Sequence, residues 1–144
     1  MKGKEALFDA GSILDLVRRF KGSAPLVLTE GSTLSLAFYE VGNAIWKECC
    51  LHARLDAHEG TSLLSALVAI IRAMNVVTPD SEQSAGKVLE LARRLGLTYY
   101  DASYLAEAKN SKRILVSDDA GLLQAARKAG VKCMTSEAFQ ASLG

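Results

Sequence analysis

The sequence predicts an α/β fold in which helices cover both faces of a mainly parallel sheet. Short apolar runs alternate along the chain with longer segments whose apolar residues recur at helical spacing. The apolar runs are continuous, as expected for parallel strands that are buried on both faces. No internal repeat, linker or low-complexity stretch interrupts this alternation, which predicts a single domain over residues 1–144.

The first half of the chain contains two expected strands and three expected helices. The stretch ALFD, residues 6–9, predicts a buried strand, and the apolar residues that follow predict a helix over 13–20. A short strand is expected near 32–35, within a stretch that favours neither structure clearly. Helical spacing from about residue 38 to 49 predicts a second helix, and the nearly all-apolar segment 61–73 predicts a third.

The second half continues the alternation and carries clearer boundary signals. After an expected strand at 75–77, Asp80 and Gln83 are placed as the capping box of a helix. This helix is expected to run to Leu95 and to end at Gly96, where glycine allows a left-handed conformation. The remaining elements, in order, are a helix at 101–109, a strand at 113–116, a helix at 120–129, a strand at 131–133 and a helix at 136–143.

Composition and charge limit the function classes. Apolar residues make up 49% of the chain and only two residues are proline, which indicates a compact protein rather than a disordered one. The 17 basic and 16 acidic side chains give a net charge of +1, which excludes a broad basic surface for nucleic acid but not a local patch. No segment has the character of a signal peptide or a membrane span, so we expect a soluble, cytoplasmic protein.

The cysteine and histidine residues give no metal-binding or disulfide pattern. Three cysteines, Cys49, Cys50 and Cys133, are an odd number, and adjacent cysteines suit neither a routine disulfide nor a zinc site. We expect all three to be small core residues in a reducing compartment. His52 and His58 are expected on the surface.

Four acidic residues, Asp9, Glu40, Asp101 and Asp119, stand at comparable places along the pattern. Asp9 ends the first expected strand and Asp119 follows the strand ILV, so both are expected at the carboxyl edge of the sheet, where open α/β folds bind ligands. Asp101 is the first residue on the face of the helix at 101–109 that is expected to be buried. Glu40 lies at the edge of the corresponding face of the helix at 38–49. No lysine or arginine recurs beside all four acids. A divalent cation is therefore a natural partner, and an all-oxygen site favours Mg²⁺ or Mn²⁺.

Each acid also has an ordinary structural explanation. Asp101 alone is typical of a helix N-cap, and Asp118 or Asp119 is typical of a cap on the helix that follows. Glu40 on a helix surface is typical of a solvated side chain, and Asp9 could cap the next helix. These alternatives stay open for each residue taken singly, whereas the joint pattern favours a shared ion.

Four segments, FDAGSIL, FYEVGNAIWKE, YYDASYLAEAK and ILVSDDAGLL, resemble the PIN-domain family, in particular the VapC-type toxins of prokaryotic toxin–antitoxin pairs. The resemblance spans nearly the whole chain, and the second and third segments are the most specific. It implies a three-layer α/β/α sandwich with a central, mainly parallel sheet. It also implies a ribonuclease that depends on Mg²⁺ or Mn²⁺.

The family's acidic set falls on Asp9, Glu40, Asp101 and Asp119, which the resemblance makes the catalytic residues and metal ligands. The residues expected to orient these carboxylates or to contact substrate are Ser12, Asn43, Ser117 and Asp118. Ser117 matches the hydroxyl residue that is common two positions before the last acid, whereas Asp118 is expected to be a cap or an outer acid. The family often has Asp-x-Ser at the first strand, but here Gly11 takes that place and the serine follows one position later.

The resemblance implies an endoribonuclease that is the toxin of a type II toxin–antitoxin pair. It implies an RNA substrate, a cognate antitoxin that binds across the active site, a homodimer and no membrane association. For the RNA path, the basic candidates are Arg18, Arg19, Lys47, Lys112 and Arg113, although each alone is typical of a solvated surface residue.

Two other functions fit parts of the pattern. A PIN-like interaction module without catalysis would keep the fold, but the complete set of acids disfavours it. A response-regulator receiver domain also carries paired acids on an α/β sheet, but its pair ends the first strand, where this chain has Asp9 alone. Nucleotide-binding classes are disfavoured because the sequence contains neither GxGxxG nor GxxxxGK followed by serine or threonine.

Overall fold

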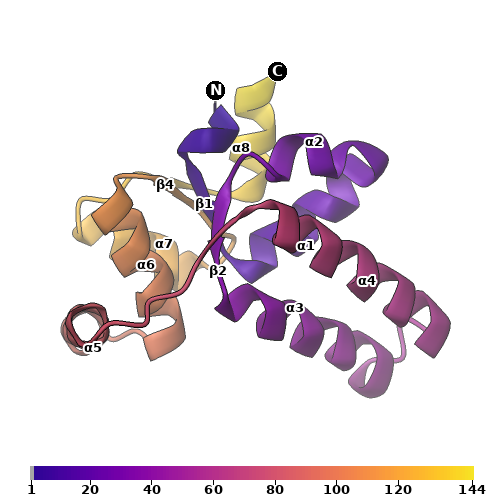
Figure 1. The fold of residues 1–144 in the computed structure, drawn as a ribbon, viewed down its shortest axis with the longest axis horizontal. Helices are drawn as coiled ribbons and strands as arrows, with labels where there is room; N and C mark the ends of the chain where they lie inside the picture. Colours follow the sequence, from indigo (N-terminus) through magenta and orange to yellow (C-terminus); the bar gives the residue numbers. More distant parts are fainter. Residues whose placement is uncertain (1) are drawn as a thin grey trace.

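A five-stranded parallel sheet forms the centre of the protein (Figure 1). The computed structural model describes residues 2–144. In chain order the strands are β1 (Ala6–Phe8), β2 (Ser32–Leu34), β3 (Asn75–Val77), β4 (Ile114–Val116) and β5 (Cys133–Met134). They lie side by side in the order β3-β2-β1-β4-β5, and every neighbouring pair is parallel. The chain thus moves outward from β1 to one edge and then returns to the other side of β1 at β4, which places a topological switch point between these two strands.

Helices cover both faces of this sheet. They are α1 (Ala10–Phe20), α2 (Ala24–Leu28), α3 (Leu36–Trp46), α4 (Ala57–Ala73), α5 (Glu82–Leu95), α6 (Tyr99–Ser111), α7 (Ala120–Lys128) and α8 (Ser136–Leu143), with 3-10 turns at Lys2–Glu5 and Lys21–Ser23 and a π-helical turn at Lys47–Leu51. Alternate strand residues point to opposite faces. Phe8 packs in a core with residues of α1 to α4 and α8, whereas Leu7 packs in a second core with residues of α5 to α7. The expected three-layer α/β/α sandwich is therefore confirmed.

The strands lie close to where the sequence pattern places them. β3 and α8 have the expected bounds, and β2 forms within the ambiguous stretch near 32–35. β5 is Cys133–Met134 rather than 131–133. The reason is that the amide of Val131 donates to the carbonyl of Ala126, so the chain is still held by the end of α7 where a strand was expected.

The start of α5 differs from the sequence expectation. The hydroxyl of Ser81 accepts a hydrogen bond from the amide of Ser84 at 3.0 Å, which makes Ser81 the N-cap. The capping box placed at Asp80 and Gln83 is therefore wrong. The end of this helix is as expected, because Gly96 adopts the left-handed conformation with φ of 68°.

Two other helices extend beyond the apolar pattern. α4 begins at Ala57 rather than near residue 61, because Asp56 and Glu59 form a reciprocal capping box there. α2 has no counterpart among the expected elements, and Pro25 in its first turn suits a short helix. Propensity and capping, rather than apolar periodicity, decide both boundaries.

The three cysteines and two histidines differ in their exposure to solvent. Cys50 is exposed, so the expectation that all three cysteines belong to the core is wrong for this residue; Cys49 and Cys133 are half-buried, and all three are free. His52 and His58 are exposed, as expected. Within residues 2–144, no helix combines the length and apolarity needed to cross a membrane.

Gly31, which precedes β2, tests how tightly the central strands are packed. A Cβ atom at this position would lie 2.4 Å from Cε2 of Phe8, a fully buried ring that makes an edge contact with Phe139. We expect Gly31→Ala to lower the free energy of unfolding by about 1–3 kcal/mol in urea denaturation, because the ring has no room to move. Gly86→Ala is the control: nothing lies within 4 Å of its Cβ position inside α5, and alanine there should stabilise by about 0.5–1 kcal/mol. Equal effects of the two substitutions would contradict this packing.

Candidate active site

The candidate site lies at the carboxyl ends of β1 and β4, the two strands that flank the switch point. Asp9 directly follows β1, and Asp118 and Asp119 follow β4 after Ser117. Ligands of open parallel sheets bind in the crevice at this position. The topology therefore brings together residues separated by more than one hundred positions in the sequence.

Asp9 is held rigidly at the junction of β1 and α1. It is the N-cap of α1, and its Oδ1 accepts a hydrogen bond from the amide of Ser12 at 2.8 Å. The Ser12 hydroxyl lies 2.9 Å from the carbonyl oxygens of Asp9 and Val116, so it ties the end of β1 to β4. Burial raises the pKa of Asp9, and the nearby charge of Asp118 adds to this, while hydrogen bonds from Ser117 and Ser12 oppose it. The structure thus gives Asp9 both its capping role and a costly buried charge.

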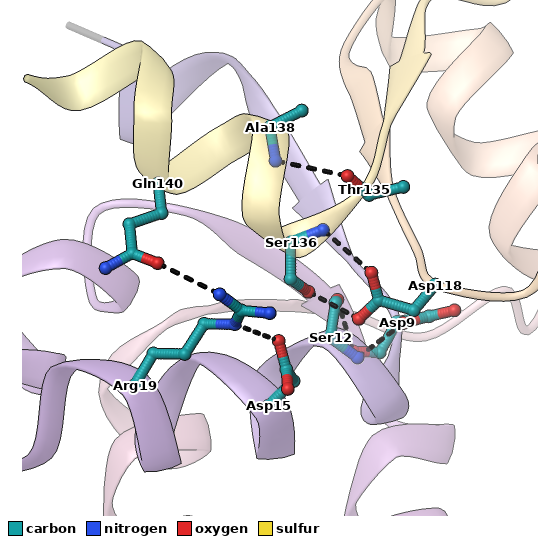
Figure 2. Close-up of polar contacts among 9 residues, drawn as sticks. All are labelled: Asp9, Ser12, Asp15, Arg19, Asp118, Thr135, Ser136, Ala138 and Gln140. Carbon is teal, nitrogen blue, oxygen red and sulfur yellow. Dashed lines mark hydrogen bonds and ion pairs between the residues drawn. The ribbon is translucent and has the colours of Figure 1, made fainter.

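The two adjacent acids after β4 have different partners. Asp119 is the N-cap of α7: its Oδ1 accepts the amide of Leu122 at 2.9 Å, and its own amide donates to the Ser117 hydroxyl at 3.1 Å. Asp118 turns the other way, and its carboxylate accepts both the amide (2.8 Å) and the hydroxyl (2.6 Å) of Ser136 at the start of α8 (Figure 2). Asp118 therefore holds the start of α8, whose N-cap is Thr135, and does not cap the helix that follows it.

Glu40 and Tyr104 join α3 to α6 across the site. The buried hydroxyl of Tyr104, a residue only 1% exposed, donates to Oε1 of Glu40 at 2.8 Å. Burial raises the pKa of Glu40, as do the charges of Asp9 and Asp101, and the Tyr104 hydrogen bond opposes this rise. Burial and the same carboxylate raise the pKa of Tyr104. Glu40 is therefore not the freely solvated side chain that its position on a helix would suggest.

Asp101 is not a helix cap. Thr98 is the N-cap of α6, and its side-chain oxygen accepts the amide of Asp101 at 3.1 Å, which overturns the capping alternative for this acid. Burial and then the charge of Asp119 raise the pKa of Asp101. Tyr104, Leu105 and Ala108, which share this face of α6, are buried, as the sequence pattern predicts.

The four acids form an electrostatically connected series. The charges of Asp9 and Asp101 both raise the pKa of Glu40, and the charge of Asp119 raises the pKa of Asp101. Their carboxylate oxygens are the donors that hard divalent ions prefer. Within residues 2–144, however, no group of three or more His, Cys, Asp or Glu side chains is gathered closely enough to hold a metal ion. The donor chemistry fits such an ion, whereas the side chains as they stand do not converge on one point.

A cleft of about 760 Å³ opens beside Glu40. Its lining residues are Ala10, Gly11, Leu36, Tyr39, Glu40, Asn43, Ala44, Lys47 and Tyr100. Asn43 is exposed in this cleft, where it is free to contact a ligand, whereas Ser12 is fully buried and its hydroxyl faces main-chain carbonyls. Ser12 therefore orients Asp9 and does not reach substrate, and Gly11 presents no hydroxyl in its place.

The basic residues suggested for an RNA path are scattered. Arg18 pairs with Glu48, and Arg19 pairs with Asp15 and contacts Gln140 (Figure 2). Lys112 and Arg113 precede β4 and so lie at the amino edge of the sheet, opposite the acids, where they line a separate cavity of about 300 Å³. Only Lys47 among the five lines the cleft beside Glu40. These five side chains therefore do not form one basic path to the acids. Lys112 and Arg113 are close to Asp119 in the sequence, but they lie at the opposite end of β4.

Comparisons with known proteins support the resemblance. Exonuclease VapC9 from Pyrobaculum aerophilum is 37% identical over 90 residues, which are 62% of this chain and 62% of the relative. Ribonuclease VapC3 from the same organism is 38% identical over 84 residues, 54% of this chain and 56% of the relative. The matches thus span less than two thirds of these curated relatives. No protein-family model matches the chain.

Solved structures extend the likeness to nearly the whole chain. The crystal structure of PAE2754 from Pyrobaculum aerophilum superposes with a TM-score of 0.77 and 29% identity over 96% of both chains. The resemblance to the PIN-domain family is confirmed. FitAcB from Neisseria gonorrhoeae superposes with a TM-score of 0.62 and 18% identity over 92% of this chain and 98% of that chain, which shows the PIN fold alone.

The raised pKa of Asp101 predicts how stability depends on pH. Because burial and Asp119 raise this pKa, the native state holds the proton more tightly than the unfolded state does. The contribution of Asp101 to stability without metal should therefore be most favourable below the ordinary carboxyl pKa, about 4, and should be lost as pH rises through the raised value. We expect Asp101→Asn to flatten this fall and to raise the melting temperature at neutral pH. Glu107→Gln, on the same helix, is the control for loss of one charge, and a melting profile for Asp101→Asn that matches it would contradict the prediction.

The Tyr104–Glu40 hydrogen bond predicts a second effect. Tyr104→Phe preserves the buried ring but leaves Glu40 without its donor, so we expect a loss of about 1–3 kcal/mol in the free energy of unfolding. The pKa of Glu40 should rise further, since the bond that lowers it is gone. Urea denaturation and an NMR titration of Glu40 measure the two effects. Tyr99→Phe is the matched control on the exposed start of α6; an unshifted Glu40 titration in Tyr104→Phe would show that the hydrogen bond is weak in solution.

Proposed function

We propose that this chain is a metal-dependent endoribonuclease, the toxin of a type II toxin–antitoxin pair, which hydrolyses phosphodiester bonds in RNA with Mg²⁺ or Mn²⁺. The observation that supports the proposal is the electrostatic coupling of four acids from separate segments: the charges of Asp9 and Asp101 raise the pKa of Glu40, and the charge of Asp119 raises the pKa of Asp101. Buried carboxylates that raise one another's pKa are costly unless a cation joins them. The names of the relatives, exonuclease and ribonuclease, support nuclease chemistry for this site.

In this proposal Asp9, Asp101 and Asp119 hold the cation, with Glu40 as a further ligand. A bound divalent cation supplies activation of the attacking water and neutralises charge that develops on the scissile phosphate. The chain's own contribution is orientation. Ser12 fixes Asp9, the amide of Leu122 fixes Asp119 and the Tyr104 hydroxyl fixes Glu40. Each of these hydrogen bonds uses one oxygen of the carboxylate.

Partners and location follow from the same proposal. We propose RNA as substrate, a cognate antitoxin that covers the crevice, a homodimer and residence in the cytoplasm. An antitoxin arginine placed among the four acids would form charge-assisted hydrogen bonds and neutralise them without the cation. This would explain how a protein partner silences the enzyme, because it would compete for the same oxygen atoms.

A second candidate is a PIN-like interaction module without catalysis. The observation that favours it is the lack, within the described part of the chain, of three acidic side chains already gathered as metal ligands. Calorimetric titration with Mn²⁺ distinguishes the two. Heat of binding that disappears in the acid-to-amide variants supports the nuclease, and the absence of any heat supports the module.

Cleavage and metal binding should depend on the same acids. We expect Asp101→Asn and Asp119→Asn to reduce RNA cleavage by more than the roughly 10- to 100-fold that changes outside the ligand shell cost. EDTA should abolish cleavage. Mn²⁺ at one hundred times its dissociation constant should stabilise the wild type by about 2.7 kcal/mol and the variants far less.

The product pattern separates endonuclease from exonuclease. A circular RNA has no ends, so only an endonuclease can linearise it. We expect the wild type with Mn²⁺ to linearise a circular RNA, as seen by gel mobility. Degradation of linear RNA with an intact circle would instead assign an exonuclease, in line with the name of one relative.

A further inference from the structure

Two exposed tyrosines stand directly before two of the candidate acids. Tyr39 precedes Glu40 on α3 and is 81% exposed; Tyr100 precedes Asp101 on α6 and is 60% exposed. Both line the cleft beside Glu40. Consecutive residues of a helix point about 100° apart, so each aromatic ring points in a different direction from the acid that follows it.

We infer that Tyr39 and Tyr100 form a stacking site for the bases of single-stranded RNA on either side of the cleaved phosphate, an inference that rests on the proposed function. Aromatic side chains at the surface of single-strand binding sites stack on bases, and they tolerate every base because each has a π face. RNA recognition relies mainly on unpaired bases that are splayed out in this way. A phosphate held at the acids would leave its neighbouring bases beside these rings.

The polar residues of the cleft suit a nucleotide. Asn43 on α3 and Lys47, the first residue of the π-helical turn, follow Tyr39 at intervals of four, and all three line the cleft. Lys47 makes no ion pair with any residue in the described part of the chain, so its ammonium group is available for a backbone phosphate. The Asn43 amide offers both a donor and an acceptor to a base edge. An aromatic surface beside one cation and one amide matches single-stranded RNA better than a wholly apolar protein helix.

Lys47 supplies a local positive charge in the cleft of a chain that is nearly neutral as a whole. The chain as a whole carries only +1, and the acids near the cleft repel phosphate. Stacking is insensitive to this repulsion, so it supplies affinity where electrostatic attraction is weak. Double-stranded RNA, whose bases are already stacked, would gain none of this affinity.

The test measures binding of a fluorescein-labelled oligouridylate of about eight nucleotides by anisotropy in EDTA, against an abasic ribose-phosphate oligomer of the same length. We expect the wild type to bind the oligouridylate more tightly. Tyr39→Ala and Tyr100→Ala should each weaken this binding by about 5- to 150-fold and remove the preference over the abasic oligomer, while Tyr39→Phe and Tyr100→Phe should keep both. In cleavage assays the alanine variants should raise KM with little change in kcat.

Two matched controls sharpen the result. Tyr99→Ala removes the same side chain from the neighbouring position, which does not line the cleft, and should leave binding unchanged. Lys47→Met should reduce the slope of log affinity against log salt by about 0.7, the value for one phosphate on a single strand, whereas Lys87→Met on α5 should leave it unchanged.

The possible outcomes separate this inference from the proposed function. If the wild type cleaves RNA and both alanine variants bind oligouridylate and its abasic analogue as before, the stacking site is wrong and the nuclease assignment stands. If the alanine variants keep RNA affinity but change the oligomeric state in light scattering, the tyrosines belong to a protein interface and the inference is overturned. If the wild type neither cleaves nor binds RNA, the proposed function fails with it.

Discussion

The burial of like charges at the switch point between β1 and β4 is the constraint on which the site depends. Asp9, Glu40 and Asp101 all have raised pKa values, and in each case the loss of water is the main cause. No basic side chain of residues 3–144 forms an ion pair with any of them. Such an arrangement opposes folding, and its persistence is understandable if a cation or a cationic partner relieves the repulsion.

The fold accommodates these charges because two of the acids also stabilise it. Asp9 and Asp119 cap α1 and α7, where the helix N-terminus favours a negative side chain. Capping and chemistry are therefore not competing explanations for these two residues, since the cap uses only one oxygen of each carboxylate. Asp118 shows the contrast, because both of its oxygens bind Ser136 and its contribution is to hold α8.

Local signals in the sequence were sufficient for the strands, for most helices and for placing Asp9 and Asp119 after the ends of β1 and β4, because strand ends and helix faces are local properties. They were insufficient where a partner comes from another element. The Tyr104–Glu40 bond spans 64 residues, and its only signal is a phenol on an otherwise apolar buried stripe, which implies an unseen acceptor. The sequence also did not show that Thr98, rather than Asp101, caps α6. Both residue types cap helices well, and the backbone conformation decides between them.

The distribution of charge along β4 explains how a nearly neutral chain could act on RNA. Four cations, Lys109, Lys112, Arg113 and Lys132, surround the cavity at the amino end of this strand, while the acids follow its carboxyl end. The same three-residue strand thus separates a positive surface from a negative crevice. A divalent ion among the acids would cancel part of the negative charge of the crevice and so weaken its repulsion of phosphate. Metal and RNA would then bind cooperatively, since each lowers the electrostatic cost of the other. RNA affinity in this protein would accordingly be set less by its net charge than by whether the ion is in place.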